Sequence, residues 1–310
     1  MIVVLAGGVG AAKFLEGVVQ TSPPEQVTAV VNTGDDFVLH GLNISPDIDI
    51  VTCTLANLID RQQGWGILND TTACMDWLAK LGGPNWFKLG DRDLALHIRR
   101  TALLREGWSL SQVTDSFRRA LGVRVRIVPM SDDPAPTHIL TDAGEFHFEE
   151  YFVQRRAEDT IQGIRLHAAG VAQPAPGLLE LIATADVVMI APSNPIVSVG
   201  PILALPGLHK ALRATAAPVV AVSPIVGGAA IKGPAAPLMR AAGHEVSALG
   251  IAHIYADLID ALVIDQVDAD LAAPITDLGL AVAVTDTIMR GTAEKANLAA
   301  TVLALANTIA

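Results

Sequence analysis

Hydrophobic and polar positions follow one another along this chain in a way that predicts buried strands separated by helices. An apolar run from Ile2 to Leu5 leads into the glycine-rich turn Gly7 to Gly10, and a second apolar run covers Gln26 to Val31. Short apolar runs bounded by turn residues are typical of strands that are buried on both faces of a parallel sheet. We therefore expect the chain to begin with a central strand, a tight turn and a helix.

The second half of the chain repeats this order of strand and helix. After Gly177 the pattern predicts helices up to residue 184 and near 208–213, 235–242 and 293–305, with strands at 187–191, 219–222, 262–264 and 281–284. Alternating strands and helices are typical of a parallel sheet covered on both faces. The predicted fold class is α/β, with a doubly wound, mostly parallel, Rossmann-like sheet.

Two segments interrupt the alternation. Residues 47 to about 122 have apolar positions at helical spacing with glycine-rich breaks, which predicts an inserted helical subdomain. After a strand at 123–128, residues 137–150 form two alternating runs around the turn Asp142-Ala143-Gly144, which predicts a small hairpin excursion. The chain shows no internal repeat and no flexible linker, so we predict a single domain over residues 1–310.

Composition restricts the partners and the compartment. The 310 residues are 51% hydrophobic, which is enough to fill a large core, and the net charge of −11 opposes binding to the phosphate backbone of nucleic acids. Four prolines interrupt the longest uncharged stretch, residues 187–208, which argues against a membrane helix. The two cysteines, Cys53 and Cys74, form no disulfide framework, and no signal peptide precedes the first strand. We expect a cytoplasmic protein with small-molecule partners.

The turn Gly7-Gly8-Val9-Gly10 is the first candidate binding site. Glycines let backbone N–H groups close on an anion at the start of the next helix, where the helix dipole favours negative charge. Such a turn also serves for close packing of a helix against a strand. It lacks both the G-x-G-x-x-G spacing of dinucleotide sites and the Gly-Lys-Ser/Thr of a P-loop. The sequence thus predicts a nucleotide diphosphate site of another kind.

Polar loops follow three further predicted strands. Because the carboxyl ends of parallel strands meet at one edge of the sheet, we expect these loops to converge on one crevice. Each loop alone is equally typical of an ordinary turn, whereas their recurrence favours a nucleotide site. The predicted nucleotide-binding residues in them are Asn32, Thr33, Ser193, Asn194, Pro195, Ser223, Gly227 and Gly228.

Carboxylates near the same edge predict a metal site. Asp35 and Asp36 follow the second strand, and Asp47 and Asp49 begin the predicted helical insert. Oxygen ligands beside a diphosphate favour Mg²⁺. Asp47 fits helix capping equally well, whereas Asp49 lies further into the predicted helix and is less readily explained as a cap. The sequence does not decide whether Asp36 replaces Asp35.

A group of aromatic and charged residues in the insert predicts an acceptor pocket. Lys88 and Asp91 lie close in sequence to Trp86 and Phe87, and Trp65 precedes them. Flat apolar faces beside an ammonium group suit a planar heterocycle with an anionic part. The alternative for the tryptophans is packing in a core.

Eight ordered segments carry a resemblance to a known family. They are LAGGVGAAKFLEGV, VVNTGDDF, ISPDID, GWGILNDT, KLGDRDLALHIRR, PMSDDP, APSNPIVSVGPIL and AVSPIVGG, from the first strand to about Gly233. On these segments the chain resembles the 2-phospho-L-lactate transferase family (CofD, or FbiA in some bacteria). That family joins a phosphorylated three-carbon acid to the deazaflavin Fo in the pathway to coenzyme F-420.

The resemblance implies a Mg²⁺-dependent transfer. In it, the terminal ribityl hydroxyl of Fo attacks the phosphorus that bears the acid, and GMP leaves from a guanosine diphosphate-linked donor. It assigns the donor to Gly7–Gly10 and the polar strand-end loops, Fo to Asp49, Lys88 and Asp91, and the metal to Asp35 and Asp49. Asp35, Asp49 and Lys88 are thereby the expected catalytic residues. It also implies a homodimer, and leaves open whether the acid is lactate, enolpyruvate or glycerate.

Two other functions are alternatives to the transferase. Related proteins with the same glycine-rich opening resemble non-catalytic regulators of carbon metabolism that bind a UDP-sugar. The acceptor-side segments ISPDID and KLGDRD favour the transferase over that regulator. A nicotinamide-dependent dehydrogenase is disfavoured because the dinucleotide fingerprint is missing.

Overall fold

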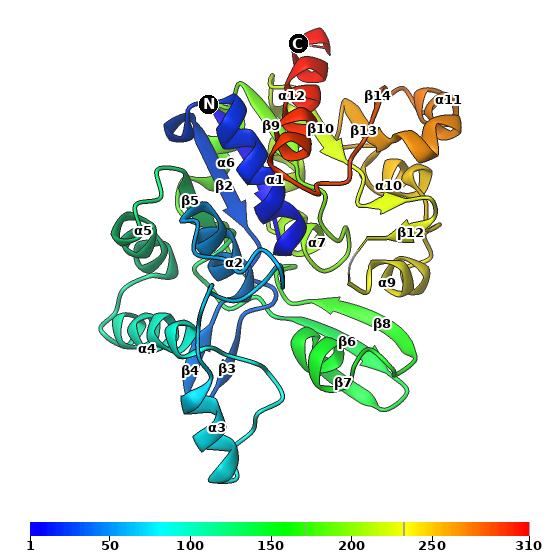
Figure 1. Ribbon diagram of the computed structural model, residues 1–310. Helices are drawn as coiled ribbons and strands as arrows, with labels where there is room; N and C mark the ends of the chain where they lie inside the picture. Colours follow the sequence, from blue (N-terminus) through cyan, green and yellow to red (C-terminus); the bar gives the residue numbers. More distant parts are fainter. Residues whose placement is uncertain (171, 232, 310) are drawn as a thin grey trace.

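Seven parallel strands form the central sheet of the protein (Figure 1). The computed structural model describes residues 1–170, 172–231 and 233–309. The sheet runs in the order β14-β13-β10-β9-β1-β2-β5, and each neighbouring pair is parallel. Its strands are β1 (Ile2–Ala6), β2 (Val27–Val31), β5 (Arg126–Pro129), β9 (Val187–Ile190), β10 (Val219–Val222), β13 (Ala261–Asp265) and β14 (Ala281–Thr285).

The direction of strand addition reverses between β1 and β9. From β1 the chain builds outward through β2 to β5, and it then returns to add β9, β10, β13 and β14 on the other side. Leu5 of β1 lies opposite Ile190 of β9, so the two strands end almost level with each other. In sheets of this kind ligands bind in the crevice outside the carboxyl ends of the strands at such a reversal.

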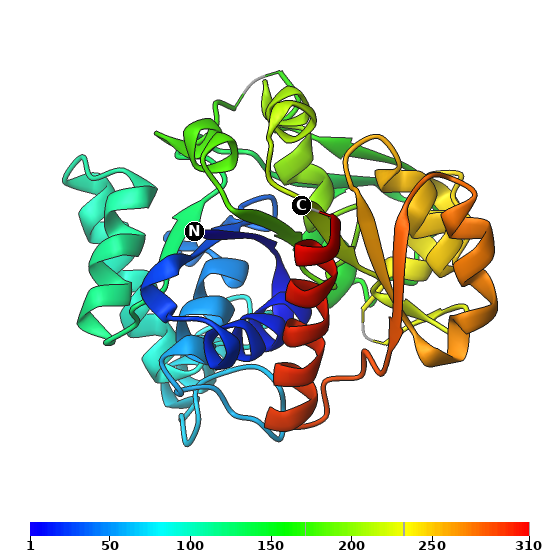
Figure 2. The ribbon, with the colours of Figure 1, turned by 90° about the horizontal axis from the view of Figure 1, so that it is seen from above.

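Alternating residues of the strands enter two separate cores. In β1, Val3 and Leu5 join one core, while Ile2, Val4 and Ala6 join the other. One face is covered by α1 (Gly8–Thr21), α2 (Pro46–Leu55) and α12 (Thr292–Ile309), and the opposite face by α6 (Leu178–Ala183), α7 (Val199–Leu203), α8 (Leu208–Ala214), α9 (Ala235–Ala241) and α10 (Ala248–Tyr255). Figure 2 shows α1 and α12 side by side along one side of the sheet.

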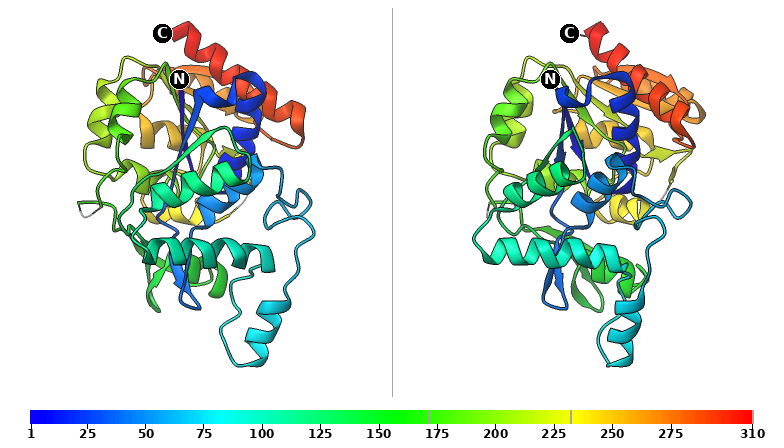
Figure 3. Two further views of the ribbon diagram at one scale, coloured as in Figure 1. Left: turned by 90° about the vertical axis from the view of Figure 1, so that its left-hand side faces the viewer. Right: turned by 60° about the vertical axis from the view of Figure 1, so that its left-hand side comes forward.

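The helical insert between β2 and β5 contains α2, α3 (Ala73–Lys80), α4 (Asp91–Arg105) and α5 (Leu110–Ala120). Both views in Figure 3 show α3 projecting from the rest of the molecule. Before the insert, β3 (Phe37–Leu39) and β4 (Leu42–Ile44) form a short antiparallel hairpin that the sequence did not predict. The sequence pattern could not reveal this hairpin, because strands of three residues are too short for an alternation of apolar and polar positions to be recognised.

The expected hairpin is one part of a larger side sheet. β6 (Thr137–Thr141) pairs with β7 (Gly144–His147) as predicted, and β6 also pairs with β8 (Ile161–Leu166), which was not predicted. Between β7 and β8, residues Glu150–Gln154 form a π-helix, η2. The remaining short elements are η1 (Pro24–Gln26), β11 (Ile225–Val226), β12 (Ala229–Ala230), η3 (Gln266–Leu271) and α11 (Ala272–Thr276).

The α/β class and the parallel, doubly wound sheet predicted from the sequence are confirmed. The division of the chain into a single domain stays a prediction. Within the three described ranges, no helix combines the length and the apolar character needed to cross a bilayer.

The contact between α1 and α12 depends on a glycine. A Cβ atom on Gly17 would lie 2.1 Å from the backbone oxygen of Lys295. We expect Gly17→Ala to lower the free energy of unfolding by about 1–3 kcal/mol, because overpacking must separate the two helices. Chemical denaturation measures the change, and Gln20→Ala, at an exposed position on α1, is the control with an effect within about 0.5 kcal/mol. Equal stability of the two variants would contradict the packing argument.

Candidate functional site

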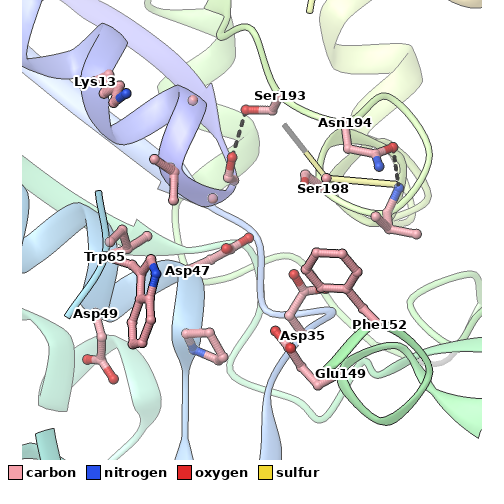
Figure 4. Close-up of a pocket in the computed structure, with 18 of the residues that line it drawn as sticks. Lys13, Asp35, Asp47, Asp49, Trp65, Glu149, Phe152, Ser193, Asn194 and Ser198 are labelled. Atoms are coloured by element: carbon pink, nitrogen blue, oxygen red, sulfur yellow. Dashed lines mark hydrogen bonds between the residues drawn. The ribbon is translucent and has the colours of Figure 1, made fainter. Parts of the chain in front are cut away.

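A cavity of about 1040 Å³ opens at the carboxyl edge of the sheet, beside the strand reversal (Figure 4). Loops and helix ends from distant parts of the chain surround it. They include the β1–α1 turn, the start of α2, residues 65–67 and 86–89 of the insert, residues 148–153 of the side sheet, residues 192–198 after β9, residues 223–224 after β10, and residues 287–290 after β14. The expected convergence of strand-end loops is thus present in the structure.

The N-terminus of α1 borders this cavity. Helix α1 begins at Gly8, its N-cap residue Gly7 has no side chain that could cap it, and its first turn contains no acidic residue. Gly7, Val9, Gly10 and Lys13 line the same part of the cavity. The positive partial charge of a helix start is suited to an anion.

The glycines of this turn also permit close packing. A Cβ on Gly10 would lie 2.3 Å from the carbonyl oxygen of Pro192, and a Cβ on Gly7 would lie 2.6 Å from Cβ of Ser198. The Ser193 hydroxyl donates a hydrogen bond of 2.8 Å to the Gly7 carbonyl. Gly8 has a φ of 69°, which glycine adopts without strain. Close packing and an open helix terminus therefore occur together here.

Three buried carboxylates, Asp35, Asp47 and Glu149, line the cavity next to that helix terminus. Burial raises the pKa of Asp35 well above its usual value, and the charges of Asp47 and Glu149 raise it further. Burial also raises the pKa of Asp47 to about 6 and that of Glu149 to about 8. Oδ1 of Asp35 is buried without a hydrogen-bond partner. We call these residues the carboxylate trio.

The trio offers oxygen ligands, the type of ligand that a hard divalent cation prefers. Hard cations such as Mg²⁺ are held by one or two carboxylates together with phosphate oxygens and water. A cation would remove the mutual repulsion that raises the pKa values and would give the orphaned Asp35 oxygen a partner. The cavity beside the trio leaves room for a phosphorylated ligand.

Asp47 points out of its helix towards the site instead of capping it. The side-chain amide of Asn32 donates a hydrogen bond of 2.9 Å to Oδ2 of Asp47, and the Gly8 backbone N–H also donates to this carboxylate. Asn32 donates further to the carbonyl of Val197. Asp47 therefore does not cap its own helix, which was the alternative that the sequence left open. Its carboxylate is instead hydrogen-bonded to the β1–α1 turn.

Asp49 also lines the cavity, but its charge is paired. Arg100 of α4 is 1% exposed and forms an ion pair with Oδ1 of Asp49, while Nδ1 of His97 lies 3.5 Å from Oδ2. Burial lowers the pKa of His97 to about 4, so this imidazole is neutral. In Figure 4 the Asp49 carboxylate points away from Asp35 and Glu149. Its predicted roles as metal ligand and Fo contact stay predictions.

Aromatic side chains line the part of the cavity in the insert and the side sheet. Trp65, Trp86, Phe87 and Lys88 lie along the insert, as predicted for the acceptor pocket. Trp86 and Phe87 also pack on Phe37, with ring centroids 5.7 and 5.0 Å apart, so they belong to a small core as well.

A second aromatic pair comes from the side sheet. Phe148 and Phe152 line the cavity with their rings stacked 5.7 Å apart at an interplanar angle of 3°. Phe152 belongs to the π-helix η2, an irregular element that often occurs at functional sites. The cavity thus presents flat apolar faces from two separate segments.

Asp91 does not line the cavity. Asp91 is half-buried, and its carboxylate accepts hydrogen bonds from the Thr71 hydroxyl and from the backbone N–H groups of Ala73 and Cys74 at the start of α3. These bonds lower its pKa. Its predicted contact with Fo stays a prediction, and its position explains only a role in holding α3.

Several predicted nucleotide-binding residues lie behind the cavity wall. Ser193, Asn194 and Ser223 line the cavity, whereas Asn32 and Thr33 are buried beneath it. The other predicted residues of these loops that do not line the cavity are Pro195, Gly227 and Gly228. The Gly227 N–H donates to Asp268 instead.

Asp36 lies apart from the carboxylate trio. It borders a second cavity, of about 350 Å³, and accepts a hydrogen bond of 2.7 Å from Ser45. Burial raises its pKa well above the usual value. Of the two aspartates after β2, the structure brings Asp35 to the main cavity.

Sequence reasoning missed several polar residues of the cavity, among them Lys13, Glu149, Ser198 and Arg290. Lys13 lies three residues after Gly10, in the first turns of the helix. A lysine so close to the glycine turn could have been identified from the sequence as a candidate phosphate contact. Glu149 follows the predicted hairpin, and Arg290 follows the last strand. No local pattern distinguishes these two, because their neighbours in the cavity are more than a hundred residues away in the sequence.

Comparisons with known proteins agree with this geometry. The family model described as 2-phospho-L-lactate transferase CofD matches residues 2–292. A phosphoenolpyruvate transferase of Kitasatospora aureofaciens is 42% identical over 99% of this chain and 98% of its own length. A 2-phospho-L-lactate transferase of Methanothermobacter thermautotrophicus is 41% identical over 96% of each chain.

Among solved structures, a member of the UPF0052 family from Bacillus halodurans has a similar fold. It covers 97% of this chain and 99% of its own, with a TM-score of 0.63 and 18% sequence identity. That identity supports the fold alone. The family model and the relatives at about 40% identity carry the assignment: the chain belongs to the 2-phospho-L-lactate transferase CofD family and is a transferase of coenzyme F-420 biosynthesis.

Proposed function

We propose that this transferase moves a phosphorylated three-carbon acid, 2-phospholactyl or phosphoenolpyruvyl, from a guanosine diphosphate-linked donor to the ribityl hydroxyl of Fo and releases GMP. The observation that carries the proposal is the composition of the cavity of about 1040 Å³. It borders an anion-binding helix start, the carboxylate trio and two groups of aromatic side chains. The helix start suits a diphosphate, the carboxylate trio suits a divalent cation, and the aromatic side chains suit a planar ring system.

In this proposal the donor diphosphate lies at the N-terminus of α1, beside Lys13. The backbone N–H groups there bind phosphate oxygens, and a lysine at this place adds a positive charge. The Ser193 and Ser223 loops also border the cavity, and a nucleoside would extend along them. The helix thereby fixes the direction in which the diphosphate points.

The carboxylate trio would hold Mg²⁺ against that diphosphate. The ion, when bound, supplies the positive charge that polarises the phosphoryl oxygens. Asn32 and the Gly8 N–H orient Asp47, so this carboxylate needs no rearrangement to bind a cation. Asp35 and Glu149 complete the set from β2 and from the side sheet.

The aromatic walls would bind the deazaflavin. Trp65 and Trp86 on one side and Phe152 on the other offer flat apolar surfaces for a tricyclic ring. A ring held there places its ribityl chain towards the trio and the diphosphate. Positioning the hydroxyl in line with the leaving group is itself a large part of catalysis in such transfers.

The direct test supplies purified protein with Fo, Mg²⁺ and each guanylylated acid in turn. Mass spectrometry of the product identifies the lactyl, enolpyruvyl or glyceryl derivative, and GMP is measured in the same reaction. Tight binding of a UDP-sugar with no turnover of any donor would favour the regulator instead. Light scattering on the same sample tests the homodimer that the family resemblance implies.

The first prediction concerns Asp47. We expect Asp47→Asn to lower turnover at least about a hundredfold, since loss of a metal that polarises phosphoryl oxygens costs several kcal/mol. Its melting temperature stays close to that of the parent, because the change removes a buried charge. Steady-state kinetics and thermal unfolding measure the two quantities.

Two further carboxylates serve as controls for Asp47. Asp159 pairs with Arg155 away from the cavity, so Asp159→Asn keeps its turnover. Asp49→Asn leaves the buried Arg100 without its partner and is expected to cost about 3–5 kcal/mol of stability. Turnover in Asp47→Asn equal to the parent, with Asp49→Asn inactive but stable, would instead support Asp49 as the metal ligand.

The second prediction concerns pH. The pKa values of Asp47, about 6, and Glu149, about 8, lie above their usual values, so the metal-free protein loses stability as the pH rises through this window. Mg²⁺ displaces the protons, and the increase in melting temperature on adding Mg²⁺ should therefore be larger at about pH 8.5 than at about pH 5.5. Glu149→Gln should flatten the upper part of this dependence. An equal Mg²⁺ effect at both pH values would count against the trio.

The third prediction concerns Lys88. Its ammonium group can reach the polar edge of a ring held at Trp86, and a hydrogen bond to a charged group contributes about 1.5–3 kcal/mol. We expect Lys88→Ala to raise the KM for Fo by roughly ten- to a hundredfold and to leave the KM for the donor unchanged. Lys80→Ala, on α3 outside the cavity, is the control. A defect confined to the donor would assign Lys88 to the other half of the site.

A further inference from the structure

Outside the transferase cavity, one face of the side sheet gathers titratable residues. His138 of β6 lies directly opposite His147 of β7 and opposite Arg165 of β8. Glu145 and His167 each lie two residues from these paired positions. Because side chains alternate along a strand, all five project from the same face of the three-stranded sheet.

The other face of this sheet is apolar. Ile139, Phe146 and Ile164 belong to a core with Phe148 and Tyr151. The polar face also has one contact with the body of the protein, since the His147 ring lies 5.6 Å from that of Phe37, but His138 and His167 have no such aromatic contact outside the side sheet among the described residues. Its histidines require a separate explanation.

Three of these residues have the geometry of metal ligands. One ligand atom from each of His138, Glu145 and His167 lies within 4.8 Å of the other two. Nδ1 of His138 is 2.9 Å from Oε1 of Glu145, and the His138 and His167 rings meet edge to face at a centroid distance of 4.8 Å. Nε2 of His167 is buried and has no hydrogen-bond partner.

Space for a further ligand lies beside this cluster. The second cavity, of about 350 Å³, is lined by His138 and His147. Two imidazoles and one carboxylate with a fourth position for water are a common donor set for Zn²⁺. Mg²⁺ prefers oxygen ligands alone, so the cluster and the carboxylate trio differ in the metal that they favour.

Arg165 is the existing partner of Glu145. Its Nη1 atom lies 2.7 and 2.6 Å from the two carboxylate oxygens. The Arg165 side chain is 50% exposed and can turn into solvent. A cation bound to Glu145 therefore competes with a partly solvated ion pair, which is a weak competitor.

We propose that His138, Glu145 and His167 form a zinc site that fastens the three strands of the side sheet together. The site does not depend on the proposed transfer reaction. β7 continues directly into Phe148 and Glu149, which line the main cavity. A metal on the side sheet therefore holds one wall of the transferase site in place.

The test is a titration of EDTA-treated protein with Zn²⁺ in the presence of excess Mg²⁺, which occupies the carboxylate trio. We expect one Zn²⁺ per chain by calorimetry and by metal analysis after desalting. Co²⁺ in place of Zn²⁺ should give the visible absorption of a tetrahedral site. The melting temperature should rise with Zn²⁺, because the ion binds only the folded sheet.

Variants separate this site from other histidines. His138→Ala and His167→Ala should each weaken Zn²⁺ binding at least about tenfold, since even outer contacts of metal sites contribute that much. Arg165→Gln should strengthen it, because the competing cation is removed. His209→Ala and His253→Ala, at exposed helix positions, are matched controls and should bind as the parent.

The proposal is overturned if the parent binds no Zn²⁺, or if His138→Ala and His167→Ala bind Zn²⁺ as the parent does. Circular dichroism verifies that the variants fold. Should His138→Ala fail to fold, His167→Ala and Arg165→Gln still decide the question, since His167 follows the end of β8. Opposite changes in affinity for these two variants are the result that supports the site.

Discussion

The reversal of strand order between β1 and β9 is the constraint on which the functional site depends. The two strands end nearly level, and their chains then leave in opposite directions along the sheet. The loops after them must separate, which opens a crevice at the buried centre of the molecule. Small residues at positions 7, 10 and 198 let the two loops touch at their base, so the crevice begins directly above the sheet.

This crevice holds charges that are unfavourable without a ligand. Three buried carboxylates line it, burial raises the pKa of each, and repulsion from neighbouring carboxylates raises the pKa of Asp35 and Glu149 further. Asp49, two residues after Asp47, differs from the trio because its charge is balanced by the buried Arg100. The same helix thus bears one buried carboxylate that faces the cavity, Asp47, and one whose charge is paired with α4 of the insert, Asp49. Such an electrostatic cost of burying carboxylates is expected where a site binds a positively charged ligand.

The sequence predicted the central sheet well because its strands are continuous apolar runs and its helices are regular. It did not predict β3, β4 and β8, which are short or only partly buried and whose pairing depends on distant segments. For the site, the glycine turn and the acceptor residues Trp65, Trp86, Phe87 and Lys88 were recognisable and line the cavity, whereas Asp91 does not. Which of the carboxylates face the cavity was harder to predict. Asp47 and Asp49 are two positions apart, so on a helix they point about 200° away from each other, and the sequence cannot tell which one faces the site.

The same limit explains why Glu149 was missed and why the side sheet matters. The alternation of β7 places Phe146 in the apolar core and His147 on the polar face, and the strand ends there. Past the strand, Phe148 is buried and Glu149 enters the cavity, more than a hundred residues from Asp35 and Asp47. The position of the third carboxylate is therefore set by how the side sheet packs on the body of the protein. A shift of one residue in the pairing of β6 with β7 would exchange the two faces of β7, and would remove both the histidine face and the wall of the transferase site.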